Sequence, residues 1–272
     1  MDEHTGAPPT RTTRRRLLAG GAAVGAVGLA GCLGGRDGPV PAPEVTSDRI
    51  EDWRRTDESE RTVFEESYGP VTVQAREHTR VFEYAPVADA LADAVDAGGS
   101  PVVFFATRID LRPAVDRLPA AVGRDRILRR VETAATDAFR GQLRSAGIEN
   151  VGIADEGIST VRSGHTATVW RLTGEYALDG EVPLPTGSAT DVGGPVEVGA
   201  RLGVWHDGTD VIVAGGAYPT EPLIAVFEAS LPESVDAERA VTELADAETA
   251  ETLATDPAAY DEDVSQLFIS VV

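Results

Sequence analysis

The sequence predicts an α+β fold in which an antiparallel β-sheet is covered by helices packed on one face. Several segments alternate apolar and polar residues with a period of two, which is typical of half-buried strands. One long segment instead places apolar residues at helical spacing. The strands follow one another with few intervening helices, so a doubly wound parallel sheet is not indicated. Residues 49–272 are long enough to bury one core, and we expect them to form this α+β domain.

The first half of the domain predicts strands followed by helices. Residues 71–75 alternate as a strand, and residues 81–84 are expected to return as its partner. Pro86 suits the first turn of a helix, which then presents an apolar stripe of Val87, Leu91, Ala94 and Val95. The apolar run at 102–107 indicates a buried strand.

A long helix over residues 124–145 is the clearest helical prediction. Its apolar stripe consists of Leu128, Val131, Ala135, Ala138, Phe139 and Leu143, and Gly147 is placed to end it. Its polar face holds six arginines: Arg124, Arg126, Arg129, Arg130, Arg140 and Arg144. We expect this face to dock internally against the acidic C-terminal part of the chain, and an anion-binding face is the alternative.

The second half predicts three more strands. Residues 166–176 alternate, and residues 196–204 do so most regularly. Asp207 and Gly208 form a turn into a strand at 211–214, which indicates a hairpin. Helices are expected at about 237–253 and 263–271.

A short internal repeat suggests that the domain consists of two duplicated halves, 49–147 and 148–272, related by a pseudo-twofold axis. The segment Gly69, Pro70, Val71, Val73, Ala75 and Arg76 recurs at the same spacing as Gly194, Pro195, Val196, Val198, Ala200 and Arg201. Trp53 upstream of the first block matches Trp170 upstream of the second. Coincidence is the alternative, since Gly, Val and Ala are common in this chain.

The N-terminus has the features of an export signal. Arg14 and Arg15 precede Leu17 and Leu18, and a weakly apolar run follows up to the small residues before Cys32. The run is too short for a stable membrane span. The arginine pair resembles a twin-arginine signal, which predicts a signal peptide over residues 1–31. An uncleaved anchor and a core helix of a cytosolic protein are the alternatives.

The residues just before Cys32 resemble a lipobox, after which this cysteine becomes the lipidated first residue. Residues 32–48 are rich in Gly and Pro, and we expect them to form an extended tether behind the lipid. A short ordered arm packed on the domain is the alternative. A single lipid chain holds a protein only marginally, so a second chain is expected.

The composition is strongly acidic. All 24 cations are arginines, against 45 carboxylates, and the net charge is −21. An acid excess of this kind is typical of halophilic proteins, whose surface carboxylates retain water and cations at high salt. Genome bias and cation binding are the alternatives. Nucleic acid is not an expected partner, because binding phosphates needs a cationic face.

Candidate catalytic residues and cofactor sites are lacking in the sequence. Cys32 is the single cysteine, so neither a disulfide nor a thiolate metal site is expected in the domain. His78, His165 and His206 remain weak metal candidates, because their spacing matches no metal-binding motif. No cofactor and no catalytic residue are predicted.

The export motif, the lipobox, the absence of lysine and the acidic domain together resemble the twin-arginine-exported lipoproteins of halophilic archaea. The domain looks loosely like their uncharacterised mixed α/β families, which supply no catalytic residues. The resemblance implies a lipid anchor at Cys32 on the extracytoplasmic face of the cell membrane, and the twin-arginine export machinery as a partner. We expect a non-enzymatic binding or structural module. A secreted hydrolase with a carboxylate or His-metal site, or a small solute-binding lipoprotein, is the alternative.

Overall fold

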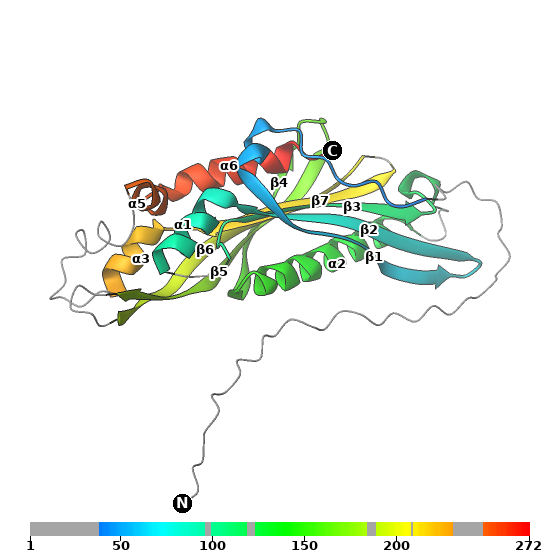
Figure 1. Cartoon of the computed structure of the whole chain (residues 1–272). Helices are drawn as coiled ribbons and strands as arrows, with labels where there is room; N and C mark the ends of the chain where they lie inside the picture. The colour runs from blue at the N-terminus through cyan, green and yellow to red at the C-terminus, as the bar shows by residue number, and fades with distance from the viewer. Residues whose placement is uncertain (1–37, 96–98, 119–122, 184–188, 208, 231–246) are drawn as a thin grey trace, which may run out of the picture. The chain divides into compact units, whose positions relative to one another are not determined.

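A computed structural model describes residues 38–95, 99–118, 123–183, 189–207, 209–230 and 247–272. Residues 34–272 form one compact unit built on a single sheet of seven strands in the order β1-β2-β3-β7-β6-β5-β4 (Figure 1). All neighbouring strands are antiparallel. The α+β prediction is therefore confirmed, and the two halves of the chain share one sheet.

The strands are long, and they include two that the sequence does not predict. Their bounds are β1 (Trp53–Tyr68), β2 (Val71–Tyr84), β3 (Val103–Arg112), β4 (Ile148–Thr160), β5 (Thr166–Pro183), β6 (Ala189–His206) and β7 (Asp210–Pro219). Residues 71–75 and 81–84 belong to one continuous strand, β2, whose hairpin partner is β1. The predicted hairpin at Asp207 is confirmed, since β6 and β7 pair along its length.

The described helices are the short 3-10 turns η1 (Asp48–Asp52) and η2 (Val115–Arg117), and α1 (Ala85–Val95), α2 (Arg124–Ser145), α3 (Leu223–Ser230), α5 (Ala247–Leu253) and α6 (Pro257–Ile269). The prediction for 124–145 is confirmed at both ends. Gly147 follows the helix with a φ of 85°, and its N–H donates to the Arg144 carbonyl. The predicted helix at 237–253 falls partly outside the described residues, which include only its last turns as α5.

Helices cover both faces of the sheet, which corrects the expectation of one covered face (Figure 1). On one face, Phe139 of α2 packs against Phe105 of β3 with ring centroids 4.9 Å apart. On the other, Phe268 of α6 packs edge-on against Trp205 of β6 at 5.4 Å. The residues of the central strand β7 are almost all buried, on both of its faces. Helices on both faces of the sheet are therefore needed to shield these residues from water.

Glycines let α6 approach the sheet closely. A Cβ at Gly203 would lie 2.2 Å from the Phe268 ring, and one at Gly216 would lie 2.9 Å from Val264. The helix begins at Asp256, whose side chain accepts a hydrogen bond from the Ala258 N–H at 2.9 Å. It starts earlier than the predicted 263–271 because Pro257 occupies its first turn.

The Gly/Pro-rich segment is an ordered arm from Gly38 onward, so the tether expected over 32–48 does not extend into this part. Val40 is buried, and its carbonyl lies 2.9 Å from Nδ1 of His78. Farther along, Val45 pairs with Val271 as a β-bridge. The alternative of an arm packed on the domain therefore applies to residues 38–47.

The segments that repeat in sequence occupy comparable strands. The block at Gly69 leads into β2 and the block at Gly194 lies in β6, while Trp53 begins β1 and Trp170 lies in β5. In the sheet order, β2 and β6 flank the central β3–β7 pair, and β1 and β5 lie one strand farther out. This placement is compatible with duplicated halves and does not by itself establish them.

Candidate functional site

An open cleft of about 1080 Å³ lies beyond the C-terminal end of α2. Its walls come from the β1–β2 hairpin, the turn at 99–100 before β3, the last turn of α2, and strands β4 to β6. Val81, Val103, Ala146, Ala177 and Pro195 supply apolar surface. The volume is at the upper end of the range usual for small-molecule sites.

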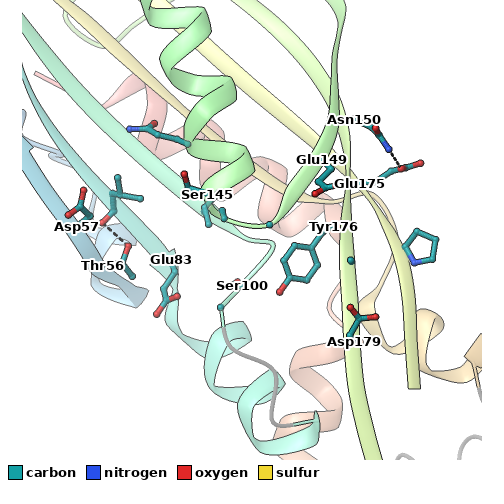
Figure 2. Close-up of a pocket in the computed structure, with 18 of the residues that line it drawn as sticks. Thr56, Asp57, Glu83, Ser100, Ser145, Glu149, Asn150, Glu175, Tyr176 and Asp179 are labelled. Atoms are coloured by element: carbon teal, nitrogen blue, oxygen red, sulfur yellow. Dashed lines mark hydrogen bonds between the residues drawn. The ribbon is translucent and has the colours of Figure 1, made fainter. Parts of the chain in front are cut away.

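The polar lining is almost entirely acidic. Five acidic residues line the cleft: Asp57, Glu83, Glu149, Glu175 and Asp179 (Figure 2). Arginine and histidine do not occur among the described lining residues. The cleft is therefore a region of negative potential in an already acidic protein.

These carboxylates differ in how far the protein neutralises them. Glu83 forms an ion pair with Arg54 at 2.7 Å, and Glu175 accepts a hydrogen bond from the Asn150 amide at 2.5 Å. The other three, Asp57, Glu149 and Asp179, form no ion pair with any residue that the structure describes. Negative charge thus remains uncompensated on both sides of the cleft, on β1 and on β4–β5.

A backbone irregularity at Asn150 shapes the cleft wall. Asn150 is the one described non-glycine residue with positive φ, at 53°, a conformation that asparagine tolerates better than most residues. The pairing of β4 with β5 shifts register between Glu149 and Gly152, so the residue lies in a β-bulge. Bulges re-aim side chains, and here Glu149 and Asn150 both line the cleft.

Tyr176 projects into the cleft from β5 (Figure 2). The residue is 6% exposed, and its ring lies against Gly147, where a Cβ would come within 3.2 Å of it. Burial, and to a lesser degree the Asp179 carboxylate, raises the pKa of the phenol above its ordinary value. The hydroxyl therefore stays protonated at neutral pH, and no described residue forms a hydrogen bond with it.

A second polar group near the cleft is unsatisfied. Gln142 lines the cleft from the last turn of α2, and its side-chain oxygen is buried without a hydrogen-bond partner. A buried acceptor in this state costs about 1–3 kcal/mol relative to a bonded one.

The three candidate histidines do not converge. His78 lies on β2 beneath the arm, with its ring nitrogens 2.9 Å from the Val40 carbonyl and 2.8 Å from Glu58. His206 lies near Arg124 and His165, and burial, followed by these two neighbours, lowers its pKa. Over the described residues, no group of three or more His, Cys, Asp or Glu side chains is arranged to hold a metal ion.

The arginine face of α2 contacts β1 instead of the acidic C-terminal helix α6, which covers the opposite face of the sheet. Arg126 lies over the Tyr68 ring at 5.1 Å, and Arg130 lies over the Phe64 ring and pairs with Glu66 at 3.1 Å. These two arginines therefore make internal contacts, as expected, but with β1 and not with the acidic C-terminal part of the chain. The other four arginines form no ion pair with any described residue, and all of them except Arg140 are exposed: Arg124, Arg129, Arg140 and Arg144.

A family model described as a domain of unknown function, DUF6517, matches residues 40–271. The chain belongs to this family. The DUF6517 domain begins within the ordered arm, so the arm and the cleft are both parts of it. No curated protein matches the chain, and no solved structure matches it.

The predicted export and lipidation residues Arg14, Arg15, Leu17, Leu18 and Cys32 lie outside the described residues. Within the described ranges, none of the helices is both long and apolar enough to cross a membrane. No motif or spacing in the sequence distinguishes the cleft residues. Asn150 was visible as the one asparagine of the chain, but nothing in the sequence linked it to Tyr176.

Proposed function

We propose that this protein is exported, anchored to the extracytoplasmic face of the cell membrane by lipid on Cys32, and binds a small ligand in the cleft at the end of α2. The observation on which ligand binding rests is the hydroxyl of the largely buried Tyr176 side chain, which faces a cavity of about 1080 Å³ without a partner among the described residues. A few convergent polar groups on apolar walls are the usual composition of a ligand site.

The sequence supports the location. Arg14 and Arg15, the short apolar run and the small residues before Cys32 occur in the order that export and lipidation require. The acidic, lysine-free composition fits an origin in a halophilic organism. The ordered arm begins six residues after Cys32, so the anchor would hold the domain close to the membrane.

The location is tested by the intact mass of membrane-extracted protein from wild type and from Cys32→Ser. We expect the wild-type chain to begin at Cys32 and to carry lipid, and the variant to lack it. A full-length, unlipidated chain in the cytosol of the wild type would overturn the export proposal.

Ligand binding is tested independently by native mass spectrometry of the purified chain. We expect a co-purifying small molecule whose retention is lost when Ser145, an exposed residue of the cleft wall, is changed to tryptophan. Thr133→Trp places the same ring at an exposed site on the same helix, away from the cleft, and should retain the molecule. Equal retention by both variants, or no retention by wild type, would contradict a ligand site in the cleft.

A further inference from the structure

We propose that the cleft takes an extended organic cation with positive groups at both ends of an apolar body, such as an oligoamine. This inference rests on the proposed ligand site and names the chemistry of its occupant. It follows from the sign of the lining charges, from their spacing, and from the unpartnered Tyr176 hydroxyl between them.

The negative charge of the residues that line the cleft favours a cationic ligand. Three carboxylates of the cleft lack an ion-pair partner among the described residues, and no described cation lines it. An anion or a zwitterion would meet only like charge at its acidic groups, and like-charge contacts are costly. A ligand with ammonium groups would instead compensate Asp57, Glu149 and Asp179.

The spacing of the carboxylates favours an elongated cation over a metal ion. Asp57 and Glu83 lie on the β1–β2 side, whereas Glu149, Glu175 and Asp179 lie on the β4–β5 side (Figure 2). In the sheet order β2 and β5 are separated by β3, β7 and β6, which corresponds to about 19 Å along the sheet surface. A metal ion needs ligands within about 2.5 Å of one point, and the described carboxylates do not converge in this way.

The groups between the two acidic sides suit an apolar spacer and its amine N–H groups. Tyr176 and Val103 line the region between the two sides, and an aromatic face also attracts a cation. The Tyr176 hydroxyl forms no hydrogen bond with a described residue, so it is free to accept one from a ligand. An ammonium has only donors, so it complements both the carboxylates and the phenol oxygen.

The test is isothermal titration calorimetry on the full chain with 4,9-dioxadodecane-1,12-diamine and the matching diol, which share a spacer long enough to reach carboxylates on both sides and differ in charge. We expect the diamine to bind at least about ten-fold more tightly than the diol, because two ionic contacts are lost in the diol. The double variant Glu149→Gln/Asp179→Asn should weaken the diamine by a similar factor. The double variant Asp125→Asn/Glu248→Gln removes the same charge from exposed sites outside the cleft and should leave binding unchanged.

The outcomes separate the inference from the proposed function. Equal binding of diol and diamine, with a ligand still retained in the native mass spectrum, would overturn the cation inference and leave the ligand site intact. Magnesium chloride that binds more tightly than the diamine, and only when Glu149 and Asp179 are intact, would replace the inference by a metal site. If neither the diol nor the diamine binds and no molecule is retained, both the inference and the proposed function fail.

Discussion

The close approach of α6 to the sheet depends on Gly203, and Gly203→Ala tests it directly. The new Cβ would lie 2.2 Å from the Phe268 ring. Carbon atoms attract one another best at about 3.5–4.0 Å, so the pair must separate by about 1.5 Å. Phe268 is 1% exposed and packs edge-on against Trp205, so its ring has no free space into which it can turn.

We expect Gly203→Ala to lower the free energy of unfolding by about 1–3 kcal/mol, the usual cost of overpacking a core. Gly199→Ala is the matched control, because Gly199 lies on the same strand and the same face. Its Cβ would meet Thr220 at 3.4 Å, and neither glycine has a left-handed φ. The control should be neutral or stabilising by up to about 1 kcal/mol, since alanine restricts the unfolded chain.

The assay is urea unfolding followed by circular dichroism, at one fixed salt concentration for all variants. Phe268→Leu shortens the side chain that the new methyl group meets, so the double variant should recover part of the loss. We expect a favourable coupling of about 0.5–3 kcal/mol between the two substitutions. Equal stability of Gly203→Ala and Gly199→Ala, or additive effects in the double variant, would refute the packing argument.

Three further predictions concern other parts of the domain. The pKa of His206 is lowered below 6.5 in the folded chain, so the unfolded chain takes up the proton first as the pH falls. The free energy of unfolding should therefore decrease from about pH 7 to about pH 5. In urea titrations, His206→Gln should flatten this pH dependence. His78→Ala removes the contact between the imidazole and the Val40 carbonyl, worth about 0.5–1.5 kcal/mol, and should speed proteolysis within residues 38–47. Unchanged cleavage would show that the other contacts of the arm, such as those of Arg76 and Arg112 with the Gly38 carbonyl, are enough to hold it. Gly147→Ala should destabilise by about 1 kcal/mol or more in thermal unfolding, since φ is 85° and the methyl group meets the Tyr176 ring; a variant as stable as wild type would contradict the strain.

The sequence predicted the inner strands and missed both edge strands. β3, β5, β6 and β7 were recognised from alternation or apolar runs, because each has a buried face that selects apolar side chains. β1 and β4 are the edges of the sheet, and most of their residues are exposed. Their charged sequences suit an edge that must not pair with other chains, but they lack the pattern that reveals a strand.

The candidate site was not predictable for a different reason. Asp57, Glu149 and Tyr176 lie on three strands far apart in the sequence, and only the sheet order places them around one cleft. In an acidic chain, no carboxylate stands out by type or spacing. The free Tyr176 hydroxyl depends on its position beside Gly147 at the end of α2, which is a tertiary contact.

The sequence by itself determined the properties that local pattern and composition encode: the α+β class, the bounds of α2, the hairpin at Asp207 and the acidic charge. Tertiary structure decided that helices cover both faces, that the arm packs on the domain from Gly38 onward, and that Arg126 and Arg130 of α2 contact β1. The physical reason is that helix periodicity and turns arise from neighbours in the chain. Burial, by contrast, depends on residues that only the folded sheet brings together.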